Sequence, residues 1–247
     1  MLAAAKGGVQ SGLMPAASGS EAAVDVWGIR FSSFHDLTKF LSVLSPEELA
    51  RAKRFRFEKD YRSFVIARGA MKLLLADYLG TAPHLLALQC NAYGKPFFEE
   101  RGREPIFFNL AHSADRALVA YCRTAPVGID IEQLRGDIPF CEIAQQHFSA
   151  AENAALNRFD ADERAAAFFR CWTRKEAYVK AYGQGLSLAL DSFDVSLRRD
   201  DDPLLLAVRH DAEADGAWNI HDVEASPGYV AALAVKAPKA ALRSLEY

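Results

Sequence analysis

The sequence has little of what disulfide frameworks, zinc sites and membrane spans require. Its four cysteines are scattered without a Cys-x-x-Cys pair, so we expect reduced thiols. Its six histidines show neither His-x-x-x-His spacing nor clustering with cysteine, which argues against zinc. The apolar stretch within residues 1–22 is short and interrupted by Pro15, so it resembles neither a membrane span nor a signal peptide. We expect a cytoplasmic protein in which residues 1–22 are a flexible N-terminal extension.

Charge of either sign is modest overall but uneven along the chain. The 247 residues carry a formal net charge of −3, with 51% hydrophobic and 25% charged residues, which is typical of a globular protein and argues against general nucleic-acid binding. Residues 45–72 nevertheless contain eight Lys or Arg against four Asp or Glu. This basic segment indicates an anionic ligand, unless it is only the solvated face of a helix.

The order of helical and extended patterns predicts an α+β fold. Strands are expected at 24–31, 106–112, 117–122, 127–132, 193–197, 204–208, 218–223 and 229–235. Helices are expected at 45–57, 60–79, 81–88, from Ser149 onward and at 162–182. Ser45 and Ser149 are each followed three residues later by a glutamate, which is the pattern of a capping box at a helix start.

A repeated spacing suggests that the fold is duplicated. Arg62, Arg68 and Lys72 recur, at an offset of about 102 residues, as Arg164, Arg170 and Arg174. With the matching element order, this predicts two similar α+β halves, 23–122 and 123–240, related by a pseudo-two-fold. Each half is expected to pack a long helix on a mostly antiparallel sheet, with 241–247 as a C-terminal tail. Ligand sites favour the cleft between such halves, and a duplicated fold favours a monomer.

Three residues of the predicted helix 162–182 share one face. Trp172, Glu176 and Lys180 stand at i, i+4 and i+8, so they form a single stripe. Taken alone, the stripe is explained by a surface ion pair between Glu176 and Lys180, which contributes about 0.2–0.5 kcal/mol.

A second acidic pair changes this interpretation. Asp130 and Glu132 alternate along the predicted strand 127–132, so their carboxylates share a face. Neighbouring like charges are unfavourable unless a cation or a proton joins them. Together with Glu176 they form a set of three carboxylates, which suits Mg²⁺ or Mn²⁺.

Four short motifs, in order along the chain, carry a family resemblance. They are Gly94-Lys95-Pro96, Phe108-Asn109-Leu110-Ala111-His112-Ser113, Val127-Gly128-Ile129-Asp130-Ile131-Glu132 and Trp172-x-x-Lys175-Glu176-Ala177-x-x-Lys180. The chain resembles the 4′-phosphopantetheinyl transferases, specifically the long two-half type that activates peptide, polyketide and fatty-acid synthases. The resemblance runs from about residue 45 to 195.

The resemblance implies a reaction and a metal site. The 4′-phosphopantetheine group of coenzyme A would pass to a serine of an apo acyl or peptidyl carrier protein, with release of adenosine 3′,5′-bisphosphate. Asp130, Glu132 and Glu176 would hold Mg²⁺, with Mn²⁺ as an alternative, and Lys180 would bind phosphate. The residues implied to be catalytic are Glu176, Asp130, Lys180 and His112. The acceptor of the serine proton stays open among Glu176, His112 and a metal-bound water.

The resemblance also implies where coenzyme A binds. Lys95, His112 and Ser113 would hold its nucleotide end, together with Lys180. Arg51 and Arg62, in the first half, would bind its 3′-phosphate. Family members often carry a basic residue where Glu48 stands, so we expect this chain to bind that phosphate differently.

Carrier proteins are generally acidic, so we expect a docking surface that is partly basic and partly apolar. The segment 138–143 is a candidate for the apolar portion, with ordinary core packing as the alternative. Coenzyme A and the apo carrier are the expected partners, with neither nucleic acid nor a membrane among them. Two other functions fit the same residues, a Mg²⁺-dependent nucleotide hydrolase and a catalytically silent module that binds coenzyme A or carrier.

Overall fold

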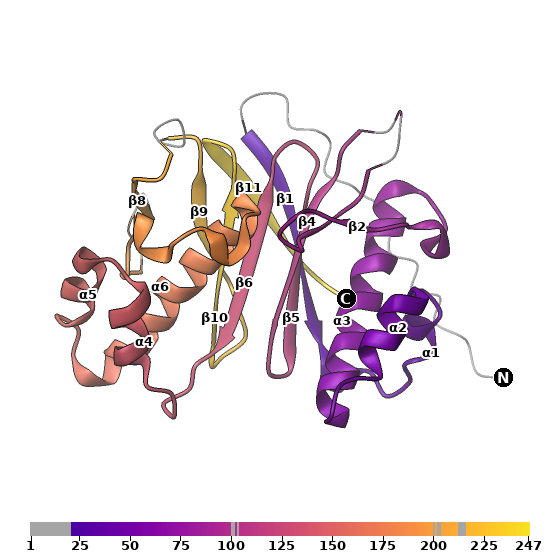
Figure 1. Cartoon of the computed structure of the whole chain (residues 1–247), viewed down its shortest axis with the longest axis horizontal. Coiled ribbons are helices and arrows are strands. Elements are labelled where there is room, and N and C mark those ends of the chain that lie inside the picture. The colour runs from indigo at the N-terminus through magenta and orange to yellow at the C-terminus, as the bar shows by residue number, and fades with distance from the viewer. Residues whose placement is uncertain (1–20, 100–101, 103, 200, 202–203, 212–215) are drawn as a thin grey trace.

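The chain forms two α+β halves that lie side by side in the computed structural model (Figure 1). The structure describes residues 21–99, 102, 104–199, 201, 204–211 and 216–247. The first half contains β1 (Glu21–Arg30), α1 (Thr38–Leu41), α2 (Pro46–Ala52), α3 (Glu58–Leu79), β2 (Gln89–Cys90), β3 (Pro96–Phe97), β4 (Phe107–Ser113) and β5 (Arg116–Cys122).

The second half begins with a strand and then adds its helices. It contains β6 (Val127–Gln133), α4 (Phe140–His147), α5 (Ala150–Leu156), α6 (Ala161–Tyr182), β7 (Phe193–Val195), β8 (Leu205–Val208), β9 (Asn219–Val223) and β10 (Tyr229–Val235). The last strand, β11 (Lys239–Glu246), returns to the first half. Both expected capping boxes are present, with Glu48 and Glu152 as the reciprocal partners of Ser45 and Ser149.

Two sheets form the middle layers of the molecule. One has the strand order β11-β1-β5-β4 and the other has the order β6-β10-β9. Neighbouring strands are antiparallel except β1 and β11. The long helix α3 covers the outer face of the first sheet, and α6 covers the outer face of the second (Figure 1).

Alternation along the strands divides the apolar residues among three clusters. In β5, Val119 faces α3, whereas Ala120 faces the other sheet. In β6, Ile129 and Ile131 join the cluster between the two sheets. Because successive side chains of a strand point to opposite faces, Asp130 and Glu132 must lie on the face that α6 covers.

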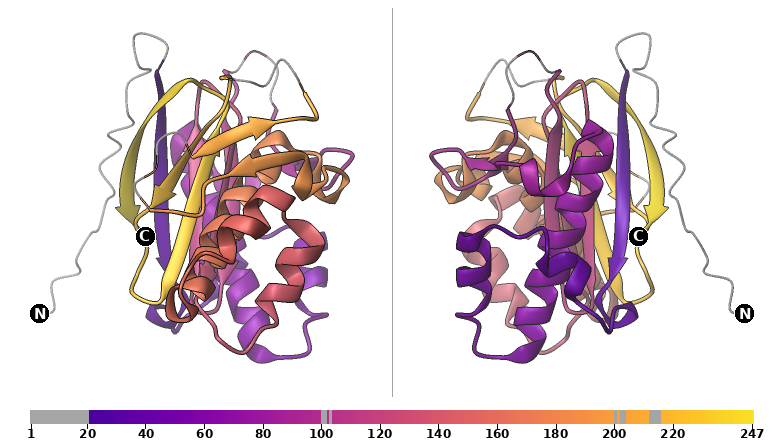
Figure 2. Two further views of the ribbon diagram at one scale, coloured as in Figure 1. Left: turned by 90° about the vertical axis from the view of Figure 1, so that its left-hand side faces the viewer. Right: turned by 90° about the vertical axis from the view of Figure 1, so that its right-hand side faces the viewer.

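Three expectations about secondary structure are corrected. Residues 241–247 were expected to be a tail, but most of them belong to β11, which pairs with β1 as a parallel edge strand (Figure 2, left). Residues 81–88 form only a short 3₁₀ turn at Pro83–Leu85, because Pro83 and the preceding αL residue Gly80 separate it from α3. The predicted helix 45–57 ends at Ala52.

Two further differences concern an unexpected helix, α4 at Phe140–His147, and the start of the first strand. β1 begins at Glu21, inside the expected N-terminal extension, and residues 1–20 lie outside the described residues. All four cysteines are free thiols. Within the described ranges, no helix combines the length and apolar character that crossing a bilayer requires.

The close approach of α6 to β6 depends on Gly128. A Cβ atom at this position would lie 2.2 Å from the carbonyl oxygen of Ala177 and 2.2 Å from the amide nitrogen of Ala181. Both are main-chain atoms of α6, so they cannot rotate away as a side chain could. Gly128 therefore sets the distance between the strand that carries Asp130 and the helix that carries Glu176.

Replacing Gly128 with alanine should lower the free energy of unfolding by about 1–3 kcal/mol, as overpacking of a core does. Urea denaturation of the purified variant measures this change. The matched control is Gly136→Ala, because a Cβ atom at Gly136 meets no atom within 4 Å. Equal stabilities of the two variants would contradict the inferred contact.

Candidate active site

The predicted stripe on α6 is the partly exposed face of an otherwise buried helix. From Cys171 to Lys180, only Trp172, Glu176 and Lys180 are half-buried, and the other residues are buried. Trp172 stacks on Phe168, with 5.9 Å between the ring centroids. Its packing anchors this end of the stripe, while Lys180 at the other end contacts β6 and Glu176 acts electrostatically on Asp130.

Lys180 pairs across the interface with Asp130. Its Nζ lies 2.5 Å from Oδ1 of Asp130, so the ammonium bonds to the strand and not along its own helix. The other carboxylate oxygen of Asp130, Oδ2, is buried and has no hydrogen-bond partner. Burial raises the pKa of Asp130 to about 7, although the Lys180 cation opposes the shift. The fields of Glu132 and Glu176 add to the increase.

Glu132 is held by a side chain from the first half. Oγ of Ser113, at the end of β4, donates to Oε2 of Glu132 at 2.7 Å and accepts from the amide of Gln133 at 3.1 Å. Farther along β4, Oδ1 of Asn109 accepts from the amide of Ile129 at 2.8 Å. These contacts join β4 to β6 although the two strands share no sheet ladder.

His112 lies next to Ser113 on β4 and near the same charges. Desolvation by the surrounding protein lowers its pKa, and the Lys180 cation lowers it further. The carboxylates of Glu132 and Asp60 act in the opposite direction. The net shift favours the uncharged imidazole, which is the form that can accept a proton.

The three predicted metal ligands, Asp130, Glu132 and Glu176, do not form a closed cluster. Over the described part of the chain, no group of three or more His, Cys, Asp or Glu side chains is gathered closely enough to hold a metal ion. The donor set nevertheless fits a hard divalent cation, because Asp130 has a buried oxygen without a partner and two further carboxylates act on it electrostatically. Lys180 now supplies the positive charge at Asp130.

The basic residues of the first half have several different roles. Arg51 is exposed, with its guanidinium carbon 5.3 Å from the ring centroid of Phe64. Arg62 donates to the carbonyl oxygen of Phe34 at 2.6 Å. Glu48, which stands where family members often carry a basic residue, is largely buried. Its carboxylate accepts from Arg68 at 2.5 Å and from Lys72 at 3.1 Å. The carboxylate therefore neutralises two cations that would otherwise contribute to an anion site.

Lys95 lies at the boundary between the halves. Its Nζ donates to the carbonyl oxygens of Val127 at 3.1 Å and Ala181 at 3.2 Å. Asn91, which sequence reasoning missed, donates through Nδ2 to the carbonyl oxygen of Gly183 at 2.8 Å. Asparagine readily bonds to the backbone two or more residues ahead, so its place before Tyr93-Gly94 was the available signal.

The candidate docking segment 138–143 contains the start of α4. Ile138, Phe140 and Ile143 pack against the apolar cluster of the second half but remain partly accessible. Core packing thus accounts for part of their apolar surface.

Comparison with known families gives a match in each half. Residues 31–124 match the 4′-phosphopantetheinyl transferase N-terminal family, and residues 126–234 match the 4′-phosphopantetheinyl transferase superfamily. A protein of Nostoc sp. named 4′-phosphopantetheinyl transferase HetI is 34% identical to the chain over 81% of each protein. The chain belongs to the 4′-phosphopantetheinyl transferase superfamily.

Other relatives of this superfamily member come from distant organisms. 4′-Phosphopantetheinyl transferase Sfp of Bacillus subtilis is 29% identical over 81% of the chain and 85% of the relative. A human protein named L-aminoadipate-semialdehyde dehydrogenase-phosphopantetheinyl transferase is 30% identical over 79% of the chain and 68% of the relative. These matches, one family in each half and Sfp among the relatives, confirm the predicted resemblance to the long two-half type.

In this superfamily member, a buried ion pair stabilises α6 on the side away from Glu176. Nζ of Lys175, next to Glu176, lies 2.7 Å from Oε1 of Glu152, and both side chains are almost fully buried. Lys175 also donates to the carbonyl oxygens of Leu190 at 2.6 Å and Phe193 at 2.7 Å. Sequence reasoning treated Glu152 only as a capping residue.

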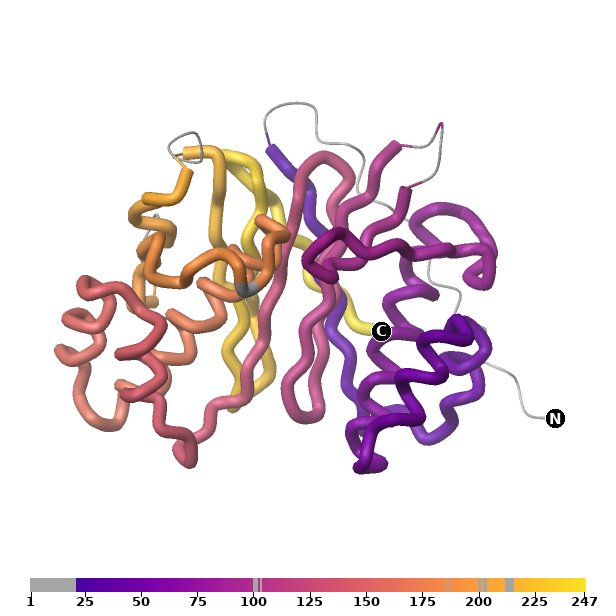
Figure 3. Tube along the Cα trace, viewed as in Figure 1, coloured from indigo at the N-terminus to yellow at the C-terminus, as the bar shows by residue number. Residues whose placement is uncertain are grey.

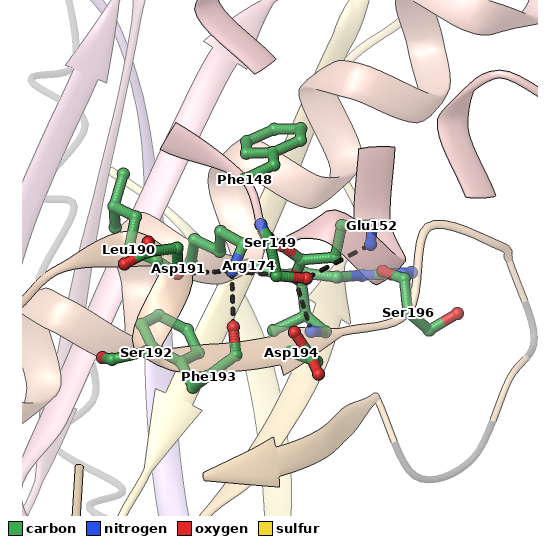
Figure 4. A network of polar contacts seen from close by, with 12 residues as sticks. Phe148, Ser149, Glu152, Arg174, Leu190, Asp191, Ser192, Phe193, Asp194 and Ser196 are labelled. Carbon is green, nitrogen blue, oxygen red and sulfur yellow. Dashed lines mark hydrogen bonds and ion pairs between the residues drawn. The ribbon is translucent and has the colours of Figure 1, made fainter. Parts of the chain in front are cut away.

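The same network joins α5 to the segment after α6 (Figure 4). Oε1 of Glu152 accepts from the amide of Val195 at 2.8 Å, while Oε2 accepts from the amide of Ser149. Arg174 donates to the carbonyl oxygen of Ser196 at 2.5 Å and forms a two-pronged contact with Asp222. Cations of α6 therefore bind the loop that follows the helix.

Changing Glu152 to Gln should lower the free energy of unfolding by about 3–5 kcal/mol, because the Lys175 charge is left without its buried partner. The measurement is chemical denaturation near neutral pH. The control is Asp137→Asn, in an exposed pair with Arg135 at 3.9 Å, which should change stability by less than about 0.5 kcal/mol. A loss in the Glu152 variant no larger than in this control would show that the pair contributes little.

Proposed function

We propose that the chain transfers the 4′-phosphopantetheine group of coenzyme A to a serine of an apo acyl or peptidyl carrier protein. Membership of the superfamily supports this reaction class. The observation that carries the proposal is the arrangement of Asp130, Glu132, Glu176 and Lys180, in which a buried carboxylate oxygen without a partner lies beside two further carboxylates and a cation.

The carboxylates form the proposed metal site. Asp130 and Glu132 from β6, with Glu176 from α6, would hold Mg²⁺, or Mn²⁺ in its place, with Ser113 orienting Glu132. The ion would supply positive charge to the pyrophosphate oxygens of coenzyme A during phosphoryl transfer. Binding the ion would also offset the burial that raises the pKa of Asp130 and the smaller repulsion from Glu132 and Glu176.

Lys180 would bind a phosphate oxygen. In the structure its side chain is partly exposed and its ammonium pairs with Asp130, so it can redirect toward a phosphate once another cation neutralises that carboxylate. Charge in the transition state spreads over the phosphate oxygens, so a second cation contributes directly to the rate.

The transfer itself exchanges one bond to phosphorus for another. The carrier serine oxygen attacks the phosphorus bonded to the pantetheine oxygen, and the pyrophosphate bridge breaks, which releases adenosine 3′,5′-bisphosphate. The serine proton passes to Glu176 or to His112. The lowered pKa of His112 increases the fraction of uncharged imidazole, which is the form that can accept this proton.

The nucleotide end of coenzyme A would lie against the first half, with His112, Ser113 and Lys180 beside the diphosphate. Arg51 and Arg62 are proposed for the 3′-phosphate. Arg51 has no carboxylate partner among the described residues, so it is available to an anion, whereas Glu48 is committed to Arg68 and Lys72.

We also propose that the halves are related by a pseudo-two-fold and that the protein acts as a monomer. The order β1-β5-β4 in the first sheet parallels β6-β10-β9 in the second. In each half the first strand precedes the helices. In each half, too, a capping-box glutamate forms an ion pair with a lysine of the long helix, Glu48 with Lys72 and Glu152 with Lys175.

The purified protein, with Mg²⁺ and coenzyme A, should add the mass of phosphopantetheine to an apo carrier protein. Intact-mass spectrometry of fatty-acid, polyketide and peptide carriers measures the adduct. Release of nucleotide or phosphate without a carrier would favour a hydrolase instead. Binding of coenzyme A with no adduct on any carrier would indicate a catalytically silent module.

Asp130→Ala should abolish transfer while changing the free energy of unfolding by less than about 1 kcal/mol, because it removes a metal ligand and also a poorly satisfied buried carboxylate. Carrier mass shift and urea denaturation are measured on the same preparation. Asp162→Ala, at the exposed start of α6, serves as the control. Transfer by the Asp130 variant at the normal rate would rule out the proposed metal site.

A further inference from the structure

The turn between β2 and β3 holds the C-terminal end of α6. Asn91 bonds to the carbonyl oxygen of Gly183, and Lys95 bonds to those of Val127 and Ala181. All three acceptors are main-chain atoms of the second half, although the two donors belong to the first. Figure 3 shows this turn next to the end of α6 and the segment that follows it.

The turn is organised before it meets α6. Oδ1 of Asn91 accepts from the amides of Tyr93 and Lys95, each at 2.9 Å, and the amide of Asn91 donates to the carbonyl oxygen of Lys95 at 3.0 Å. Gly94 supplies the positive φ of 84° that the turn requires. The aliphatic stem of Lys95 is therefore aimed at the second half by local bonds.

The Lys95 ammonium joins the two elements that carry the proposed metal ligands. Val127 is the first residue of β6 and precedes Asp130 by three positions, whereas Ala181 follows Lys180 directly on α6. A cation also interacts favourably with the carbonyl oxygens at a helix C-terminus. One charged group thus links the strand to the last turn of the helix.

This environment argues against a nucleotide contact for Lys95. Two of its three donors are used by carbonyl oxygens, and burial lowers the pKa of the ammonium to about 8. A lysine that binds phosphate usually presents its charge to solvent or to the ligand. Lys180, by comparison, has a side chain that is 29% exposed, and its ammonium pairs with a carboxylate.

We propose that Lys95 is a positioning residue, which sets the spacing of β6 and α6 and thereby aligns Asp130 and Glu132 with Glu176, and that it does not bind coenzyme A. Asn91 assists by fixing the turn and by bonding to Gly183. The role in catalysis rests on the transferase function proposed above, whereas the effect on metal binding does not.

The variants Lys95→Met and Asn91→Ala test this role, with Lys239→Met as the control because Lys239 is exposed on β11. Isothermal titration measures the affinity of each protein for Mn²⁺ alone and, separately, for coenzyme A. Steady-state transfer gives kcat and KM for coenzyme A. Circular dichroism confirms that each variant is folded.

We expect Lys95→Met to weaken Mn²⁺ binding and lower kcat by about 10–100-fold, as the loss of groups that orient metal ligands does. Its affinity and KM for coenzyme A should stay within about twofold of the wild type, since no binding contact is removed. Asn91→Ala should change the same quantities in the same direction but less, and Lys239→Met should change none.

Two results would overturn the proposal. One is a loss of coenzyme A affinity of tenfold or more in Lys95→Met with Mn²⁺ binding unchanged, which would make Lys95 a nucleotide ligand. The other result has two parts. The Asn91→Ala protein is folded and shows normal Mn²⁺ binding and kcat, and the Lys95→Met protein is either unfolded or also normal in Mn²⁺ binding and kcat. If the wild type transfers nothing but Lys95→Met still weakens Mn²⁺ binding, the positioning role stands and the proposed function fails.

Discussion

The site depends on how closely α6 packs against β6. Only a residue without a side chain fits at Gly128, where main-chain atoms of α6 would lie 2.2 Å from a Cβ atom. Nearby on the second sheet, α6 meets the small side chains of Ala232 and Ala234. Lys180 consequently reaches Asp130, so the chemistry of the site follows from the packing of one helix on small residues.

Close packing alone would leave the buried charges of α6 without compensation. Lys175 and Arg174 have fully buried side chains, and each lies against a carboxylate and main-chain carbonyl oxygens. Removing such charges from water is costly unless their partners are well placed. The partners come from α5, β9 and the segment after α6, so the same contacts that satisfy these cations also hold the helix in a single orientation.

The two halves meet through polar contacts as well as through the apolar layer between the sheets. Asn109 and Ser113 of β4 bond to β6, while Asn91 and Lys95 bond to both ends of the β6–α6 unit. The first half thus contributes groups that shape the site in the second. A ligand bound to the first half would lie next to carboxylates whose positions the first half itself determines.

The sequence by itself determined the local features of this protein. Capping patterns located the starts of α2 and α5, and periodicity placed Glu176 and Lys180 on one face of α6 and Asp130 and Glu132 on one face of β6. Only the tertiary structure decided which groups meet. Lys180 pairs with Asp130, 50 positions away, Lys95 bonds to carbonyl oxygens, and the C-terminal residues add β11 to the first sheet. Helix and strand periods report the direction of a side chain on its own element, whereas a pairing across elements depends on interelement distances that packing sets.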